Sequence, residues 1–215
     1  MIIRELVFIR HGQAQCNVDG VVGGPAACTG LTEFGHRQAG RAARCLADEQ
    51  ALRPFTALYA GPRLRLQQTG QILARALGLR LVVEPLLDGP LHGEADGRPW
   101  REIKDAFGGG PHTRPDSPWA TGSDTWRGYL QRAGQDMHEL LNRHQEGRIL
   151  IVAHGETVIA AHTLLLRLAP ESAGFTVDHA SFTRWQQHRN RRGQQRWLLH
   201  SHNDTAHLAE LSDRP

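Results

Sequence analysis

Apolar runs and segments of helical periodicity alternate along most of the chain. The runs at 6–9 and 149–153 are short, continuous and apolar, which is typical of strands buried on both faces of a sheet. Shorter or more polar runs, bounded by turn residues, predict further strands. These lie at 55–60, 79–85, 178–188 and 194–202, and a turn at 190–193 joins the last two.

Apolar residues at helical spacing fill the stretches between these strands. The predicted helices cover 32–50, 63–77, 124–144 and 156–169. Thr32 opens the first helix, Gly78 is a suitable residue after the second, and Ser123 is a suitable N-cap for the third. The alternation predicts an α/β fold: a three-layer sandwich with a mostly parallel central sheet and helices on both faces.

The pattern breaks between 86 and 122, where glycine and proline are frequent and periodicity is lost. One short helix is predicted there, near 100–107. A length of 215 residues suits one domain. We therefore predict a single domain over 1–215 that carries a loop-rich insertion at about 86–122 and covers one edge of the sheet.

Composition narrows the class of protein. Charged residues of both signs are interspersed, the formal net charge is +3, and Lys104 is the only lysine. The three cysteines show no paired spacing, so neither a disulfide framework nor a metal site is expected. No window is apolar enough to span a membrane, and the N-terminal sequence lacks signal-peptide features, which predicts a cytoplasmic protein. The arginine-rich stretch around 190 is interpreted as a solvated turn, and neither nucleic acid nor a membrane is an expected partner.

Two of the buried strands end in histidine. Arg10 and His11 follow the first apolar run, and His154 follows the fourth strand along the chain. In open α/β sheets, ligands bind just outside the carboxyl ends of the strands. Arg63 and Arg65 begin a helix at the same edge. Guanidinium groups are suited to phosphate oxygens and imidazole can attack phosphorus, so this set predicts a phosphate site.

Five segments carry a resemblance to a known family. "FIRHGQAQCN" is similar to the Arg-His-Gly signature of the histidine phosphatase superfamily, which has the phosphoglycerate-mutase-like fold. "GLTEFGHRQA", "GPRLRLQQTG", "LIVAHGETV" and "HNDTAHL" resemble further family segments in the family's order, from residue 3 to 208.

The resemblance implies catalytic roles at the sheet edge. His11 would be the nucleophile that forms a phosphohistidine, with Arg10, Arg65 and His154 around the phosphoryl group. Arg65 rather than Arg63 takes the family position, because it lies three residues before Gln68-Thr69. Arg63 is predicted to be a surface arginine.

Smaller contributions to phosphate or substrate binding are also implied. Gly12 would let the backbone approach the phosphate, and Asn17 matches a family asparagine at the pocket. Gln13 stands where many members have glutamate. Gly155 completes the second His-Gly turn.

The residue that protonates the leaving group is harder to place. The family commonly has a carboxylate four residues before a glycine, and here that position falls on Gly89. Asp88, one residue earlier, is the first choice and Glu94 the second. His92 lies in the same loop and could donate, although a surface histidine is the favoured interpretation.

These features together predict a phosphatase that hydrolyses small phosphorylated metabolites, releases inorganic phosphate and needs neither cofactor nor metal. A phosphoglycerate-type mutase is the alternative enzyme, for which Arg98, Arg101 and Arg114 in the insertion could bind a carboxylate. A non-catalytic module that binds a phosphorylated ligand is the third hypothesis.

Overall fold

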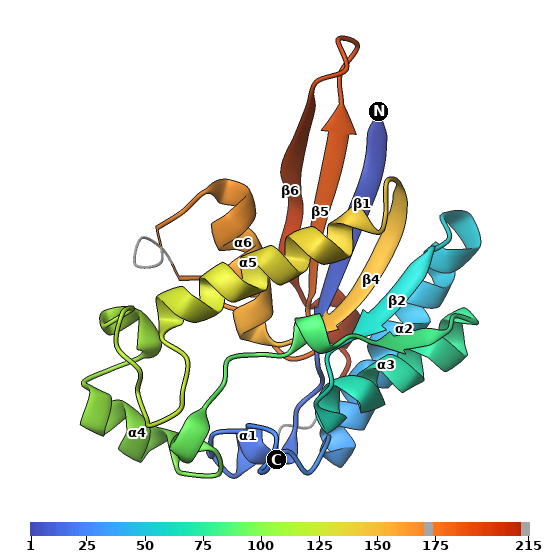
Figure 1. Ribbon diagram of the computed structural model, residues 1–215. Helices are drawn as coiled ribbons and strands as arrows, with labels where there is room; N and C mark the ends of the chain where they lie inside the picture. Colours follow the sequence, from blue (N-terminus) through green and yellow to red (C-terminus); the bar gives the residue numbers. More distant parts are fainter. Residues whose placement is uncertain (170–173, 212–215) are drawn as a thin grey trace.

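A six-stranded sheet organises the computed structural model, which describes residues 1–169 and 174–211 (Figure 1). The strands are β1 (Ile2–Arg10), β2 (Ala57–Ala60), β3 (Leu81–Val83), β4 (Gly147–Ala153), β5 (Phe182–Arg189) and β6 (Gln195–Asp204). Their order is β3-β2-β4-β1-β5-β6. The first four of these are parallel to one another, whereas β5 and β6 are antiparallel to their neighbours. The prediction of a mostly parallel sheet is confirmed, with β1 and β4 side by side.

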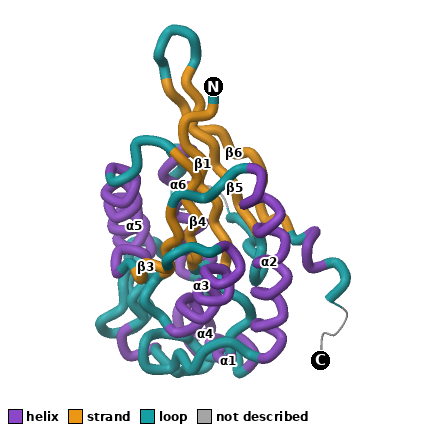
Figure 2. The backbone as a smooth tube through the Cα atoms, turned by 90° about the vertical axis from the view of Figure 1, so that its right-hand side faces the viewer, coloured by secondary structure: helices purple, strands orange, loops and turns teal. Residues whose placement is uncertain are grey.

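Helices cover both faces of the sheet, as predicted. The long helices are α2 (Glu33–Leu52), α3 (Leu64–Leu77), α5 (Trp126–Asn142) and α6 (Gly155–Leu166). Figure 2 shows α5 and α6 on one side of the strands and α2 on the other. Alternate β1 side chains serve the two layers: Val7 and Ile9 pack with α2 and α3, and Leu6 and Phe8 with α5 and α6.

Two of the three predicted helix boundaries are confirmed. The Thr32 hydroxyl accepts a hydrogen bond from the Gly35 amide at 3.0 Å, and Gly78 ends α3 with φ of 65°. The prediction for Ser123 is wrong. Thr125 caps α5 instead, because its hydroxyl lies 3.0 Å from the amide of Gly128, at the third position of the helix.

The insertion folds beneath the carboxyl ends of the parallel strands (Figure 1). It contains α4 (Trp100–Phe107) and several 3₁₀ turns, and its residues Ala95 and Ile103 form a small apolar cluster with Val22. A second short helix, α1 (Gln15–Val18), follows β1 and was not predicted. No helix within 1–169 or 174–211 combines the length and apolar character that a membrane span requires.

A buried histidine pair lies between α6 and the antiparallel strands. The His162 side chain is 0% exposed and contacts the rings of Phe175 and Trp185, at centroid distances of 4.4 and 5.5 Å. Its Nε2 lies 3.0 Å from Nδ1 of His202. Burial, with a smaller contribution from His202, lowers the pKa of His162 from 6.5 to about 4.

This shift predicts acid sensitivity of the fold. Below pH 6.5 the unfolded chain protonates His162, whereas the folded chain keeps it neutral down to about pH 4. The free energy of unfolding should therefore fall as the pH drops from 6.5 to about 4, by ~1.4 kcal/mol per pH unit for this group. In urea unfolding at pH 7, 6 and 5, the free energy of unfolding should depend less steeply on pH in His162→Gln than in wild type. Identical slopes in the two proteins would contradict the assignment.

Candidate active site

The two histidines predicted at the sheet edge lie next to each other. Arg10 and Ala153 are register partners at the ends of β1 and β4, so the next residues, His11 and His154, emerge together. The His11 amide donates to the Ala153 carbonyl at 3.0 Å, and the two imidazole centroids are 5.5 Å apart. Both side chains are buried. The parallel pairing of two strands distant in sequence creates this neighbourhood.

Hydrogen bonding fixes the tautomer of His11. Nδ1 lies 2.8 Å from the Gly12 carbonyl, which can only accept, so Nδ1 carries the proton. Nε2 therefore keeps its lone pair and accepts from Nε of Arg65 at 3.1 Å. Burial, together with Arg65 and Arg10, holds the pKa of His11 well below its ordinary value. The ring is neutral at physiological pH, with Nε2 as its nucleophilic atom.

Arg65 connects the two histidines. It lies in the first turn of α3 and is 5% exposed. Its Nε contacts His11, and Nη2 donates to Nδ1 of His154 at 3.2 Å. Because a guanidinium only donates, Nδ1 of His154 accepts and Nε2 carries the proton. Burial and the neighbouring Arg65 hold the pKa of His154 well below its ordinary value.

Buried donors without hydrogen-bond partners line the same cavity as His11. Within the described part of the chain, Arg65 Nη1, Arg10 Nε and His154 Nε2 make no hydrogen bond. Arg10 is anchored at its other end, because Nη1 donates to the Val177 carbonyl. Buried polar groups are nearly always satisfied, so an orphaned cluster of this kind indicates a ligand with several acceptor oxygens.

The glycine after His11 has a packing role. A Cβ at Gly12 would lie 2.4 Å from the carbonyl oxygen of Gly35, so α2 leaves no room for a side chain there. The Gly12 amide donates to Thr69 at 3.2 Å. Gly155 differs, since a Cβ there would make ordinary contact with Arg10 at 3.7 Å. The predicted role of both glycines in phosphate binding stays a prediction.

Asn17 lines the same cavity as His11, and its role in binding phosphate or substrate stays a prediction. Its Oδ1 accepts from the Ala14 amide and lies 3.0 Å from Nε2 of His179. With the oxygen engaged, the amide NH₂ of Asn17 is left for a ligand. His179, whose ring is 5.7 Å from that of His11, was missed by the sequence reasoning because it stands in a short polar connection before β5.

Gln13 is placed away from this cavity. Its backbone amide donates to Gln38 at 2.8 Å, and its side-chain oxygen accepts from the Thr32 hydroxyl at 2.9 Å. It lines a separate hollow with His179 and the 205–211 segment. These bonds attach the residue after Gly12 to the start of α2.

Arg63 is buried, and the prediction that it lies on the surface is wrong. Its side chain is 4% exposed and donates to the carbonyls of Gly23 and Pro90. Its Nε lies 2.7 Å from Oδ1 of Asp88, which also accepts from the Gly89 amide at 2.8 Å. Asp88 Oδ1 is 3.9 Å from Nε2 of His154. Asp88 thus lies close to His154, but it pairs with Arg63 and does not line the cavity.

The other two candidates for the acid are placed differently. Glu94 is exposed, and its backbone amide pairs with Thr121. His92 is 5% exposed, so its interpretation as a surface histidine is wrong. Its ring stacks on Trp119 at 5.8 Å, and burial, together with Arg63, lowers its pKa to about 4. His92 is therefore a neutral part of the wall.

The cluster of Arg10, His11, Arg65 and His154 opens into a cavity of about 360 Å³. Arg10, His11, Asn17, Arg65 and His154 form its floor, and His92, Trp100, Lys104, Pro111 and Trp119 from the insertion form its wall. The half-buried Glu156, two residues after His154, also lines it and was missed because it reads as an ordinary first-turn helix residue. Cys16 lines the floor as well, and burial raises the pKa of its thiol.

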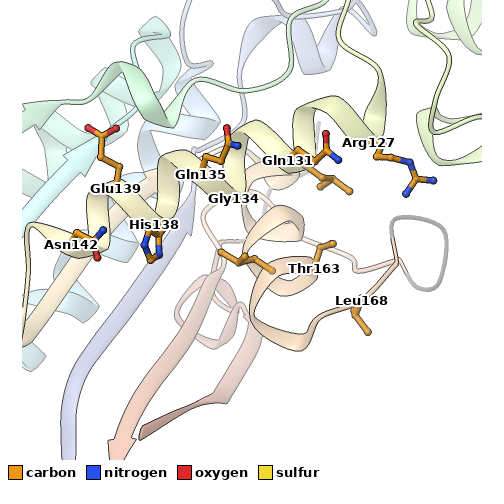
Figure 3. A pocket seen from close by; sticks show the side chains of 11 residues that line it. Arg127, Gln131, Gly134, Gln135, His138, Glu139, Asn142, Thr163 and Leu168 are labelled. Atoms are coloured by element: carbon orange, nitrogen blue, oxygen red, sulfur yellow. The ribbon is translucent and has the colours of Figure 1, made fainter.

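A second hollow, of about 650 Å³, lies between α5 and α6 (Figure 3). Its lining is largely apolar and includes Leu130, Gly134 and Leu164, with Arg127 and Glu139 at the rim. It lacks the cation and imidazole cluster of the sheet edge. Among residues 1–169 and 174–211, no group of three His, Cys, Asp or Glu side chains is placed to hold a metal ion.

Comparison with known proteins points to one family. Residues 6–205 match the model of the histidine phosphatase superfamily (branch 1). Fructose-2,6-bisphosphatase TIGAR B of Danio rerio is 28% identical over 197 residues, which is 86% of this chain and 73% of that protein.

Solved structures give the same fold. The mycobacterial glucosyl-3-phosphoglycerate phosphatase in complex with VO3 is 27% identical, with a TM-score of 0.78 over 94% of this chain and all of that one. A phosphoserine phosphatase mutant from Entamoeba histolytica, at 21% identity, has a TM-score of 0.76 over 96% of this chain and 100% of that one.

Proposed function

The chain belongs to branch 1 of the histidine phosphatase superfamily, and from that membership we propose that it hydrolyses small phosphomonoesters through a phosphohistidine on Nε2 of His11. Its relatives by sequence and by structure include phosphatases. The proposed reaction needs no metal and no cofactor, because nucleophile and cations are all side chains of this chain.

One observation carries the proposal: a neutral His11 that shares its cavity with buried donors. The lone pair of His11 Nε2 faces a cavity where Arg10 and Arg65 each present an N–H that has no partner in the described chain. A phosphoryl group bound there satisfies these donors with its oxygens. The same oxygens compete for Nε of Arg65, which releases the lone pair for attack.

The chemistry then proceeds in two transfers. The His11 lone pair forms a bond to phosphorus while the ester P–O bond breaks, and the leaving oxygen takes a proton. Arg10, Arg65 and the Nε2–H of His154 stabilise charge on the three remaining oxygens. Water next attacks phosphorus, the P–N bond breaks and inorganic phosphate departs, which restores neutral His11.

The insertion supplies the wall that faces the leaving group. Lys104 is exposed at the cavity and lies 5.6 Å from the centre of the Trp100 ring. Trp119 presents an indole N–H with no partner among the described residues. One cation and two indoles favour an ester whose leaving group combines a ring or apolar segment with a negative charge.

The three arginines of the insertion that could bind the carboxylate of a mutase substrate do not line the cavity. Arg98 pairs with Glu102 at 3.7 Å, Arg101 is 93% exposed, and the Arg114 guanidinium lies over Phe107. These placements favour hydrolysis over phosphoglycerate isomerisation.

A panel of phosphomonoesters tests the proposal. We expect release of inorganic phosphate at pH 5 to 8, with activity unchanged by EDTA. Among esters of similar size, those with a ring and a second negative charge should have the lower KM. Interconversion of 2- and 3-phosphoglycerate without release of phosphate would establish a mutase instead, and tight phosphate binding without turnover would indicate a binding module.

A further inference from the structure

We propose that Glu156 is the general acid and base of the reaction, a role that rests on the proposed phosphatase function. The leaving alkoxide of an ester must receive a proton, and a positioned donor contributes about 10²- to 10⁴-fold to the rate. Three residues on the 88–94 loop were the candidates from sequence. Of the three, only the wall residue His92 lines the cavity, and the two carboxyl groups do not.

Asp88 is engaged as an acceptor. Its Oδ1 receives the Arg63 Nε–H at 2.7 Å and the Gly89 amide at 2.8 Å. Arg63 in turn is fixed by the carbonyls of Gly23 and Pro90, so the ion pair is held from both sides. Asp88 is not among the residues that line the cavity. Both bonds fall on Oδ1, and the side chain is 22% exposed, so Asp88 pairs with Arg63 outside the cavity lining and needs its own variant in the test.

The neighbouring positions offer no other acid to the cavity. Gly89 packs against His154 so closely that a Cβ would lie 2.8 Å from Cδ2 of that ring. Glu94 is exposed and is not among the residues that line the cavity. His92 reaches the cavity, but burial and Arg63 keep its ring neutral, with a pKa of about 4. A neutral imidazole is a poor donor to an alkoxide.

Glu156 is the one carboxyl group among the residues that line the cavity. It lies in the first turn of α6, whose N-cap is His154, so the strand that positions the second histidine also positions this side chain. The pKa values of Arg10 and His92 are both lowered, mainly by burial. The negative charge of Glu156 opposes this lowering in each of them. Glu156 therefore lies within electrostatic range of the floor and of the wall.

This position is suited to proton transfer at the ester oxygen. As the N–P bond forms, the electron pair of the P–O bond goes to the leaving oxygen, which takes the proton of Glu156. The resulting carboxylate then accepts a proton from the water that attacks phosphohistidine. Phosphate leaves, and Glu156 is again protonated.

Two esters with different leaving groups test the assignment. Glycerol phosphate releases a strongly basic alkoxide that needs a proton, whereas p-nitrophenyl phosphate releases a weakly basic phenolate that does not. In Glu156→Gln we expect kcat/KM for glycerol phosphate to fall by about 10²-fold or more, and that for p-nitrophenyl phosphate by less than about tenfold. Glu156→Asp should recover part of the loss. Asp88→Asn should lower kcat/KM for both esters by the same factor.

The outcomes separate this inference from the proposed function. If wild type turns over both esters and Glu156→Gln lowers them equally, Glu156 is not the acid and the phosphatase stands. A leaving-group dependence in Asp88→Asn instead of Glu156→Gln would assign the acid to Asp88. If wild type releases phosphate from neither ester and from no member of the panel, both proposals fail. Thermal unfolding of each variant checks that the fold is kept.

Discussion

Replacement of His11 by alanine is expected to reduce phosphate release by at least about 10³-fold, because the nucleophilic nitrogen is lost while the cations remain. The loss should fall on kcat. Arg10 and Arg65 still present their free donors to a phosphoryl group, so inorganic phosphate should still bind. Acid-labile phosphoenzyme, trapped by rapid alkaline quenching after reaction with a ³²P-labelled ester, should be present in wild type and absent in His11→Ala.

A matched control separates chemistry from folding. His36 is exposed on α2, and His36→Ala should keep both turnover and phosphoenzyme. A His11→Ala protein that unfolds like wild type and retains full turnover would overturn the proposed mechanism. Phosphoenzyme that persists in that variant would place the phosphoryl group on another residue.

Arg65→Lys is expected to have the second largest effect, a loss of about 10²- to 10³-fold in kcat. The guanidinium performs three tasks at once: Nε contacts His11, Nη2 contacts His154, and Nη1 is free for phosphate. A lysine ammonium is a single point charge and cannot keep this planar geometry. Steady-state kinetics on the best ester of the panel would measure the loss.

The control for this prediction lies on the same helix. Arg75 is exposed in the last turn of α3, and Arg75→Lys should leave kcat within about twofold of wild type, as expected of a surface substitution. If Arg65→Lys also kept kcat within about twofold of wild type, a positive charge alone would suffice at this position. The contacts of Arg65 with both histidines would then not contribute to the rate.

The sheet and its catalytic edge could be predicted because their signals are local. An apolar run that ends in Arg10-His11, and another that ends in His154, indicate buried strands whose carboxyl ends carry chemistry. Topology rules for parallel sheets then bring both ends to one edge. The structure confirms this through the pairing of Arg10 with Ala153.

The wall of the cavity could not be predicted in the same way. Arg63 donates to the carbonyls of Gly23 and Pro90 and to the carboxylate of Asp88, and the last two of these partners lie in the insertion. His92 is buried with ring contacts to Trp100, at the start of α4, and to Trp119, twelve residues after that helix ends. Such contacts depend on how an aperiodic segment folds back, for which spacing in the sequence holds no signal.

The prediction of the N-cap of α5 was wrong for a related reason. Ser123 and Thr125 are both suitable cap residues within three positions, and the sequence does not favour one of them. Ser123 forms a bridge with His92 across the insertion and bonds to the Ala120 amide, which leaves Thr125 to begin the helix.

The solitary lysine of the chain gives the protein an unusual chemical handle. Lys104 is exposed at the rim of the cavity, whereas the N-terminal amine of Met1 bonds to Arg189 beside the tip of the β5–β6 hairpin. Figure 1 shows that end of β1 far from the insertion. The ε-amine of Lys104 therefore lies well away from that end of β1. A dye coupled to the ε-amine would report directly on ligands that enter and leave the cavity.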